Sequence, residues 1–386
     1  MYAGASLHID ARAIAQNTRR IAARTKAAVM AVVKADGFGH GDAALAALRN
    51  GATWLGVTSI DEALPFRWRG IDAPMLSWLN PLDADFAAAI RHDIDLAVPS
   101  LRHLASIQLA AQRVGRPAQV HLHLDSGMSR DGIDRAEWNA LCELARLGEA
   151  AGLLKVRGIM SHLARADHPG DPATRYQTLL FENAVRAARH RRLSPSVVHL
   201  AATAATLTDA RTHFGMVRVG AGLYGIDPSH STAHSTAHST AHSTAHSTVG
   251  ESLLRGAMTL TAPVTLVREV PAGTGVGYGL AYRTDRRTRL ALLPIGYADG
   301  VPRSLDGRAG VQLNGRRVPV AGTVSMDQVV LDIGDLAVAP GDRATLFGPG
   351  DEGEPTLGDW ASWAGTIEHE LVTRIGPRVS RDRTAA

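Results

Sequence analysis

The feature of this sequence that most constrains its fold is an alternation of apolar runs and helical patterns over the first 225 residues. The runs are nearly continuous and rich in β-branched residues, as in parallel strands covered on both faces. They occur at "AAVMAVVKAD", "TWLGVTS", "PMLSWLN", "IDLAVPS", "AQVHLHLDSG", "LKVRGIMSHL", "VVHLAATAA" and "MVRVGAGLYG". Strands that alternate with helices in this way predict an α/β fold, a (β/α)8 barrel of the TIM type, over residues 10–229. An open doubly wound sheet has the same alternation and is the competing prediction.

A low-complexity repeat, "HSTAHSTAHSTAHSTAHST", follows the barrel segment at residues 230–248. On a helix, the period of four would place five histidines on one face, as a metal-binding helix would: His230, His234, His238, His242 and His246. Serine and threonine form helices poorly, however, and the repeat has no apolar face with which to dock. We therefore predict a surface linker over residues 230–249 and no metal site.

Residues 250–386 show a different pattern, with short strands separated by Gly, Asn and Asp turns. The strands are read in "MTLTAPVTLVREV", "TRLALLPIGYADG", "GVQLNGRRVPVAG", "QVVLDIGD" and "RATLFGPG", and "NGRR" at 314–317 is a tight-hairpin signal. This spacing predicts a C-terminal, mostly antiparallel β-domain. The strand-like "SLHID" precedes the barrel, so residues 1–9 are a candidate for packing on the β-domain.

The composition excludes several classes of protein. Lys+Arg 41 against Asp+Glu 37 gives a net charge of +4, the arginines are scattered, and aromatic residues are only 5%, so a nucleic-acid partner is not predicted. The single cysteine, Cys142, excludes an intramolecular disulfide framework and lies in a helical pattern where a buried thiol is expected. No apolar run is long enough for a signal peptide or a membrane span, so we expect a cytoplasmic protein without a membrane partner.

Lys34 is the first candidate for chemistry. It stands at the predicted carboxyl end of the first barrel strand and is followed by the glycine-rich "ADGFGHG". Active sites of barrel enzymes lie at this face, and a lysine there suits a Schiff base with a carbonyl group. A solvent-facing lysine before a glycine-rich loop explains the position equally well.

The segment "AVVKADGFGHG" resembles the pyridoxal-phosphate attachment motif of the alanine racemase family. Six further blocks resemble that family in its order: "LDSGMSRDGI", "GIMSHLARADHP", "VRVGAGLYGIDPS", "VGYGLAY", "LLPIGYADG" and "GTVSMDQ". The resemblance covers essentially the whole chain except the histidine repeat. It implies a barrel and a β-domain, in agreement with the hydrophobic pattern, and a pyridoxal-phosphate-dependent isomerase that interconverts L- and D-alanine for peptidoglycan synthesis.

The resemblance implies roles for two acid/base residues on opposite faces of the substrate. Lys34 would hold the cofactor and serve one face, and Tyr278 of "VGYG" would serve the other, because one base alone would return the proton to the same face. Their ordinary pKa values, about 10.4 and about 10, are too high for good bases at neutral pH, so both pKa values must be tuned. His162 matches the histidine beside that tyrosine, and Arg218 matches the arginine at the cofactor's ring nitrogen.

The same resemblance implies the remaining binding residues. The substrate carboxylate and the entrance to the site would be served by Arg130, Met326 and Tyr297, and the cofactor phosphate by Thr203, Gly220 and Ala221. It also implies a homodimer with shared active sites, in which Lys34 of one chain faces Tyr278 of its partner.

Four positions depart from the family pattern. Phe38 and Pro377 stand where phosphate-binding tyrosines are usual, Ala202 replaces an asparagine, and His123 replaces a lysine that several members carbamylate beside the arginine. The departures motivate an alternative function, a racemase of another small amino acid such as serine or a pathway-specific variant. A non-catalytic pyridoxal-phosphate carrier is a weaker alternative, because such carriers lack the second domain that holds Tyr278.

Overall fold

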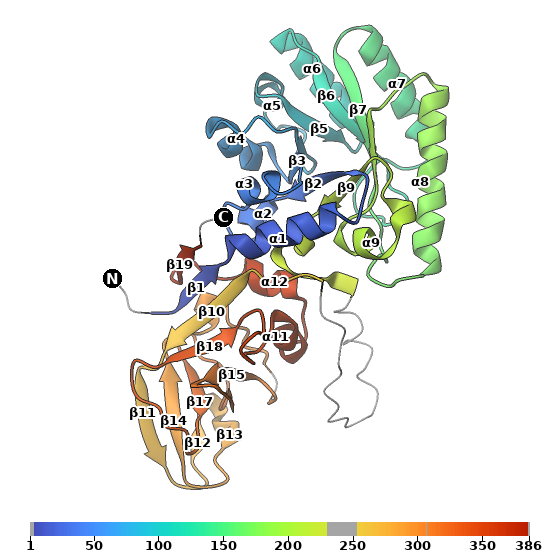
Figure 1. Ribbon diagram of the computed structural model, residues 1–386. Coiled ribbons are helices and arrows are strands. Elements are labelled where there is room, and N and C mark those ends of the chain that lie inside the picture. The colour runs from blue at the N-terminus through green and yellow to red at the C-terminus, as the bar shows by residue number, and fades with distance from the viewer. Residues whose placement is uncertain (1–3, 230–252, 306, 385–386) are drawn as a thin grey trace.

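The computed structural model describes residues 4–229, 253–305 and 307–384. Eight parallel strands of the described chain form a closed barrel (Figure 1). They are β2 (Ala28–Val32), β3 (Trp54–Val57), β4 (Met75–Ser77), β5 (Ile94–Val98), β6 (Ala118–His123), β7 (Leu154–Met160), β8 (Val197–His199) and β9 (Met216–Val219). The prediction of a closed barrel is confirmed, because β2 pairs with β9 as well as with β3. The histidine repeat lies outside the described residues.

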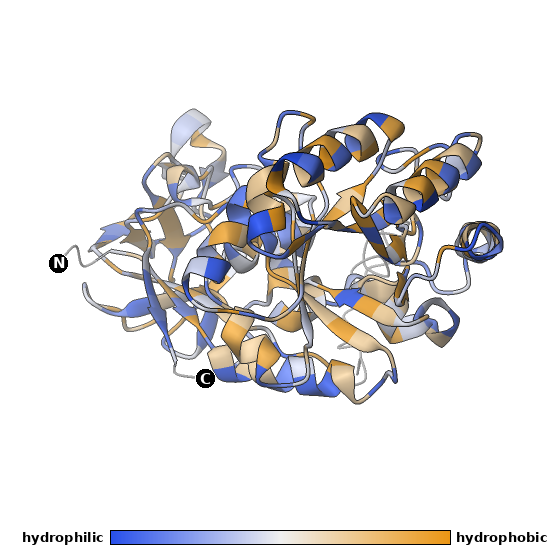
Figure 2. Ribbon diagram, turned by 90° about the horizontal axis from the view of Figure 1, so that it is seen from above, coloured by the Kyte–Doolittle hydropathy of each residue, from blue (hydrophilic) through white to orange (hydrophobic). Residues whose placement is uncertain are grey.

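Helices surround the strands and separate them along the chain. They are α1 (Ala11–Ala22), α2 (Lys34–Phe38), α3 (Ala44–Leu48), α4 (Ile60–Trp68), α5 (Phe86–Arg91), α6 (Leu101–Val114), α7 (Trp138–Ala150), α8 (Pro172–His190) and α9 (Thr203–Thr208), with short 3-10 turns η1 (Ala210–Thr212) and η2 (Ala221–Tyr224). Figure 2 shows mostly apolar strands inside a ring of helices of mixed hydropathy. None of these described helices has the length and apolar character needed to cross a membrane.

Side-chain caps explain where several of these helices begin. Ser and Asp oxygens accept hydrogen bonds from backbone amides of the first turn at Asp10, Ser59, Asp85, Ser100 and Asp171. The apolar run that includes "VVHLAATAA" is shorter as a strand than the sequence predicts, since β8 ends at His199 and α9 starts at Thr203. Alanine favours helix over strand, which accounts for the early end.

The C-terminal part is built on antiparallel strands, as predicted. A six-stranded sheet of the described chain has the order β16 (Arg316–Pro319), β15 (Gly310–Leu313), β18 (Arg343–Phe347), β10 (Met258–Pro263), β1 (Ser6–Ile9) and β19 (Ser380–Arg383). A second sheet contains β11 (Leu266–Val270), β14 (Thr288–Leu293) and β17 (Val329–Asp332), and a two-stranded ribbon contains β12 (Gly275–Val276) and β13 (Tyr282–Arg283). The pairing of β1 with β19 is parallel.

The start and the end of the described chain meet in the six-stranded sheet. β1 pairs with β10 and β19, so "SLHID" belongs to the β-domain sheet although it precedes the barrel. The predicted hairpin is confirmed, because Asn314 and Gly315 both have positive φ between β15 and β16. Two helices were not predicted, α11 (Leu357–Ala364) and α12 (Glu368–Thr373). A capping box between Thr356 and Asp359 marks the first of them.

The single cysteine is part of the apolar core. Cys142 is fully buried in α7, and burial raises the pKa of its thiol to about 12. The expectation of a buried, unreactive thiol is therefore confirmed.

Candidate active site

Lys34 lies just beyond the carboxyl end of β2, at the face where barrel enzymes carry their active sites. Its side chain is half-buried, and Nζ lies 6.0 Å from the centre of the Trp78 ring. Burial lowers the pKa of Lys34, the charge of Arg130 lowers it further, and Glu62 opposes both. The net lowering of the Lys34 pKa enlarges the fraction of neutral, nucleophilic amine near neutral pH.

The chain after Lys34 forms a left-handed turn. Ala35, Asp36 and Phe38 have φ values of 52°, 52° and 56°, which cost side-chain-bearing residues on the order of 1–2 kcal/mol each. The turn is held by Oε1 of Glu62, which accepts a 2.8 Å hydrogen bond from the Ala35 amide. Such local strain, maintained by surrounding contacts, is typical of functional sites.

Arg218 on β9 lies at the centre of a cluster at the carboxyl ends of neighbouring strands. Its side chain is 6% exposed, and it donates hydrogen bonds to the carbonyl oxygens of Ser161, His199 and Leu200. Its Nη2 lies 3.2 Å from Nδ1 of His162, and its Nη1 lies 3.0 Å from Nδ1 of His199. The structure thus brings together two residues selected from sequence, Arg218 and His162, and adds His199.

His162 is held in its neutral form. Burial lowers its pKa to about 3, and the charges of Arg218 and Arg130 act in the same direction. Because a guanidinium can only donate, Nδ1 of His162 accepts from Arg218 and the ring proton resides on Nε2. His162 therefore presents an N–H donor on its free side.

Arg130 lies on the exposed loop after β6. The carboxylate of Asp125 shapes this loop by accepting hydrogen bonds from the amides of Gly127, Met128 and Ser129. Although it is exposed, the Arg130 charge reaches both Lys34 and His162, whose pKa values it lowers. It is therefore placed to attract an anionic substrate to this end of the barrel.

Two short helical turns near these residues form the candidate anion cup. Thr203 begins α9, and Gly220 and Ala221 lie at the start of η2, where backbone amides have no acceptor within the turn. Oγ1 of Thr203 accepts a 3.2 Å hydrogen bond from the Gly222 amide and joins the two turns. A Cβ added to Gly220 would lie 2.7 Å from Cζ of Phe38, so only glycine keeps this turn open.

The remaining three residues selected from sequence lie on the β-domain. The exposed fractions are 73% for Tyr278, 53% for Met326 and 38% for Tyr297. Tyr278 is in η4 (Tyr278–Leu280), between β12 and β13. Figure 1 shows this ribbon far from α2, which begins at Lys34. Lys34 and Tyr278 are not brought together within one chain.

Arg378 links the segments that carry Tyr297 and Met326, and sequence reasoning did not select it. Its Nε donates to Asp299 in η5 (Tyr297–Asp299), and its Nη1 lies 2.8 Å from Asp327. No sequence signal distinguishes Arg378 from the other arginines of the chain. Glu62 was missed for a similar reason, because a glutamate in the first turn of a helix is ordinary.

Two protein-family models match this chain. A model described as "Alanine racemase, N-terminal domain" matches residues 9–228, and one described as "Alanine racemase, C-terminal domain" matches residues 257–383. The chain belongs to the alanine racemase family. The alanine racemase of Frankia casuarinae is 47% identical over 376 residues, which is 97% of this chain and 94% of the relative.

Solved structures of alanine racemases have the same fold. The enzyme from D-cycloserine-producing Streptomyces lavendulae matches with a TM-score of 0.92 and 38% identity, covering 100% of this chain and 98% of that chain. Alanine racemase from Bartonella henselae, solved with covalently bound pyridoxal phosphate, matches with a TM-score of 0.84 and 28% identity, covering 99% of this chain and 100% of that chain.

The site of this alanine racemase family member has donors suited to pyridoxal phosphate. The cofactor requires a lysine amine, and the pKa of Lys34 is lowered. It also requires a phosphate site, for which the backbone amides in the first turns of α9 and η2 are the candidates. Arg218 supplies a buried cation whose pKa falls to about 10 through burial, so it stays charged at neutral pH.

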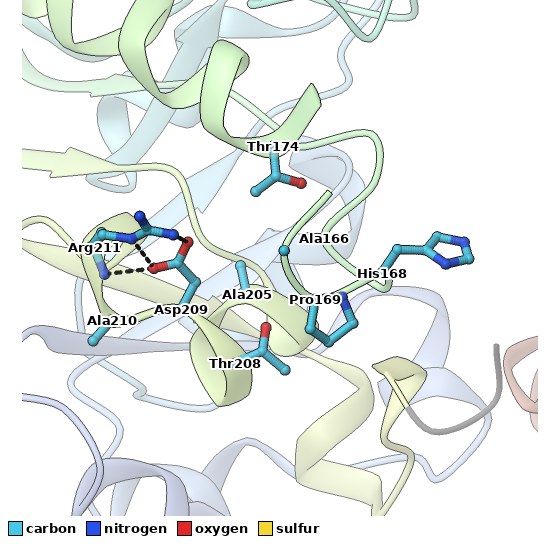
Figure 3. A pocket seen from close by; sticks show the side chains of 10 residues that line it. Ala166, His168, Pro169, Thr174, Ala205, Thr208, Asp209, Ala210 and Arg211 are labelled. Carbon is cyan, nitrogen blue, oxygen red and sulfur yellow. Dashed lines mark hydrogen bonds and ion pairs between the residues drawn. The ribbon is translucent and has the colours of Figure 1, made fainter. Parts of the chain in front are cut away.

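A separate cavity of about 310 Å³ lies near the end of α9 (Figure 3). It is lined by residues that include His168, Thr174, Thr208 and Arg211, and it contains neither Lys34 nor Arg218. Both Nε and Nη2 of Arg211 are bound by the Asp209 carboxylate, so the arginine is already neutralised. We assign the chemistry to the Lys34 site and not to this cavity.

Proposed function

We propose that this protein is a pyridoxal-phosphate-dependent enzyme that interconverts L- and D-alanine in a homodimer. The observation that carries the proposal is the division of the acid/base residues. Lys34 follows β2, which pairs with the Arg218 strand β9, and its charge acts on His162, whereas Tyr278 is exposed on the β-domain. A second copy of the chain that brings its Tyr278 to the barrel would complete the site.

When bound, pyridoxal phosphate supplies an aldehyde for the amine and a ring that withdraws electrons from the substrate α-carbon. Lys34 would hold it, with Thr203, Gly220 and Ala221 at its phosphate and Arg218 at its ring nitrogen. Arg218 gives up its proton reluctantly, so it would keep the ring nitrogen largely unprotonated and limit side reactions.

Proton exchange at the α-carbon would use two groups. Nζ of Lys34 accepts or donates on one face, and Oη of Tyr278 of the partner subunit serves the opposite face. His162 presents its Nε2–H to that tyrosine and stabilises the phenolate form, because Arg218 fixes Nδ1 as the acceptor. Arg130 would bind the substrate carboxylate, together with the Met326 amide, and Tyr297 would line the entrance.

The first experiment measures D-alanine formation from L-alanine by the purified protein with added pyridoxal phosphate. We expect turnover in the native protein, a loss of turnover and of covalent cofactor in Lys34→Ala, and a strong reduction in Tyr278→Phe. Tyr176→Phe is the matched control, since Tyr176 is also exposed, at 58%, but lies on α8. Full activity of Tyr278→Phe would refute the proposed second base.

Mixing two inactive variants tests the shared site. Lys34→Ala and Tyr278→Phe chains, unfolded together and reassembled, should form mixed dimers in which one site has both residues. About a quarter of the native activity is expected from random pairing of two chains in a symmetric dimer. If each site were complete within one chain, the mixture would stay inactive.

A second function, racemisation of another small amino acid such as serine, is favoured by the absence of a hydroxyl at Phe38. Rates with serine, alanine and larger amino acids discriminate between the two functions. A pyridoxal-phosphate carrier is disfavoured because the C-terminal family model matches residues 257–383. The D-alanine product would serve peptidoglycan synthesis in the cytoplasm, which growth of a gene-deleted strain on added D-alanine would test.

A further inference from the structure

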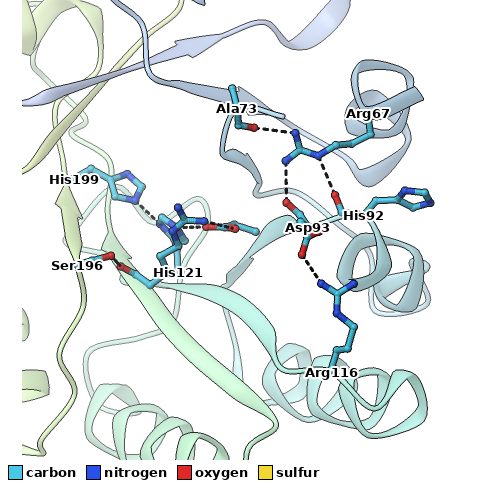
Figure 4. Close-up of polar contacts among 10 residues, drawn as sticks. Arg67, Ala73, His92, Asp93, Arg116, His121, Ser196 and His199 are labelled. Atoms are coloured by element: carbon cyan, nitrogen blue, oxygen red, sulfur yellow. Dashed lines mark hydrogen bonds and ion pairs between the residues drawn. The ribbon is translucent and has the colours of Figure 1, made fainter. Parts of the chain in front are cut away.

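A chain of buried polar side chains crosses the barrel interior beneath the active site. Asp95 on β5, His121 on β6 and His199 on β8 have exposed fractions of 0%. Nε2 of His121 lies 3.1 Å from Oδ2 of Asp95, and Nδ1 of His121 lies 2.8 Å from Nε2 of His199. Figure 4 shows His121 and His199 facing each other across the strands. At its far end His199 meets Arg218.

The two ends of this chain determine where its protons lie. Arg218 can only donate, so Nδ1 of His199 accepts and the proton of His199 is on Nε2. That proton is donated to Nδ1 of His121, whose own proton is therefore on Nε2 and is donated to Asp95. The acceptor at one end, the Asp95 carboxylate, and the donor at the other end, the Arg218 guanidinium, therefore require the same positions for the histidine protons.

Burial and the charge of Arg218 lower the pKa of His199 well below its ordinary value, so this histidine stays neutral. The backbone is also shaped around the chain. A Cβ added to Gly158 on β7 would lie 2.2 Å from Nδ1 of His121, so the space for the imidazole depends on glycine. The register of β6 against β7 shifts between Val120 and His121, at the same place.

We propose that Asp95 is a positioning residue of the racemase site, acting through His121 and His199 on Arg218. The carboxylate selects the ring tautomers that leave an acceptor facing Arg218, and so holds the guanidinium against His162. This role rests on the proposed function of Arg218 and His162, whereas the order of the protons can be observed independently of activity.

Substitution of Asp95 by asparagine should disturb this order for a geometric reason. Both carboxylate oxygens of Asp95 are acceptors, because Oδ1 lies 3.2 Å from Nη1 of Arg157 while Oδ2 faces His121. An asparagine has one oxygen and one N–H2 group, so its amide must oppose a donor on one side. If the amide faces His121, both histidines must reverse their tautomers, and His199 then presents an N–H to Arg218.

This geometry predicts a compensating substitution. In the Asp95→Asn, Arg157→Met double variant, the amide can turn toward the partly exposed place of Arg157 and leave its oxygen for His121. We expect kcat to fall by about tenfold or more in Asp95→Asn, as for other groups that orient a catalytic residue, and to recover partly in the double variant. If Asp95 only stabilised the fold, the second substitution would lower activity or stability further.

Asp93→Asn is the matched control. The substitution is chemically the same as Asp95→Asn and lies two residues away. The Asp93 side chain is 72% exposed, and it pairs with Arg116 on the outside of the barrel (Figure 4). Its φ of 53° is readily adopted by asparagine. The control should keep the native kcat, KM and melting temperature.

Neutron diffraction from deuterium-exchanged crystals of the holoenzyme supplies the readout that does not depend on turnover. We expect deuterium on Nε2 of both His121 and His199 in the native protein, and a reversed or mixed order in Asp95→Asn. Deuterium on Nδ1 of His199 in the native protein would overturn the proposal, as would an Asp95→Asn variant with the kcat of the Asp93→Asn control. Correct tautomers in a protein that racemises no amino acid would instead refute the proposed function alone.

Discussion

Oε1 of Glu62 accepts a hydrogen bond of 2.8 Å from the amide of Ala35, the residue that follows Lys34. Oε2 of the same carboxylate accepts from the amide and the hydroxyl of Thr58, at the end of β3. Glu62 therefore ties the left-handed turn after Lys34 to a neighbouring barrel strand. It also supplies a negative charge that raises the pKa of Lys34.

Glu62→Gln should lower the pKa of Lys34, because the opposing carboxylate is lost while burial and Arg130 still act. The pH dependence of the rate at which apoenzyme takes up pyridoxal phosphate measures this, since only the neutral amine reacts. The midpoint should move to lower pH than in the native protein. Asp61→Asn, an exposed neighbour, should leave the midpoint in place. Equal midpoints in Glu62→Gln and Asp61→Asn would show that the Glu62 charge does not raise the pKa of Lys34.

Arg130→Met should have the opposite effect on the same titration. The positive charge of Arg130 lowers the pKa of Lys34, so its removal raises that pKa and moves the midpoint to higher pH. The variant should also have a higher KM for alanine, because a donor for the substrate carboxylate is lost. A midpoint that moves to lower pH would show that Arg130 does not act on Lys34.

Acid should destabilise the protein through buried histidines. Burial lowers the pKa values of His40, His123 and His162 to about 4, about 4 and about 3, below an ordinary value of about 6.5. At a pH between the folded and unfolded pKa values, the unfolded chain binds more protons than the folded protein. The free energy of unfolding is therefore highest above about pH 6.5 and falls on acidification. Melting temperatures from pH 7 to 4.5 test this.

His123→Gln should weaken that dependence on pH, because one of the buried histidines no longer titrates on unfolding. His92→Gln is the control, since His92 is exposed at the end of α5 and should not change the slope. Equal slopes in the two variants would mean that His123 does not contribute to the loss of stability in acid.

The barrel could be predicted from sequence because its strands are buried on both faces and read as unbroken apolar runs. Lys34 and the Arg218–His162 pair could be selected because short motifs surround them. The left-handed turn could not, since Ala35 and Phe38 carry no preference for positive φ. Neither helix propensity nor hydrophobic period encodes a conformation that tertiary contacts impose.

Asp95 and His121 show a second limit of sequence interpretation. A polar residue within a strand usually indicates a solvent-facing position, yet both side chains lie inside the barrel. Their meaning depends on His199 and Arg218, which are more than seventy residues away from His121. Tyr278 shows a third limit, because its side chain is exposed in its own chain and its proposed role depends on a second copy.

Arg378→Met should raise the KM for alanine. Its Nε donates to Asp299 and its Nη1 contacts Asp327, so it joins the segments that carry Tyr297 and Met326. Without the bridge, these two residues lose their relative placement, while most of the fold is unaffected because Arg378 is half exposed. Steady-state kinetics should show a larger change in KM than in kcat.

Arg374→Met is the matched control for that prediction. Arg374, the C-cap of α12, contacts Glu370 of that helix at 3.6 Å, and an exposed pair of this kind contributes little. The control should keep the native KM. A rise in KM of similar size in both variants would indicate a general effect of lost charge at this surface and not a role for the bridge.

Phe38 lies beside the proposed phosphate cup, where the family resemblance implies a hydroxyl. Its Cζ is the atom that a Cβ on Gly220 would contact at 2.7 Å, so a substituent on that ring carbon would lie beside the Gly220 turn. The ring is 8% exposed and packs on Tyr224, with 5.1 Å between centroids. The present side chain contributes only apolar contact to the cup.

Phe38→Tyr should therefore bind pyridoxal phosphate more tightly. A new hydrogen bond to a charged group is worth about 1.5–3 kcal/mol, which corresponds to a dissociation constant about ten- to a hundredfold lower. Equilibrium dialysis of apoenzyme with cofactor measures the constant, and the melting temperature shows whether the buried hydroxyl is tolerated. Phe66→Tyr, at a partly buried ring in α4, should leave cofactor affinity unchanged. Weaker binding in Phe38→Tyr, with an unchanged melting temperature, would show that the phosphate does not lie beside Phe38, and the cup formed by α9 and η2 would have to be reassigned.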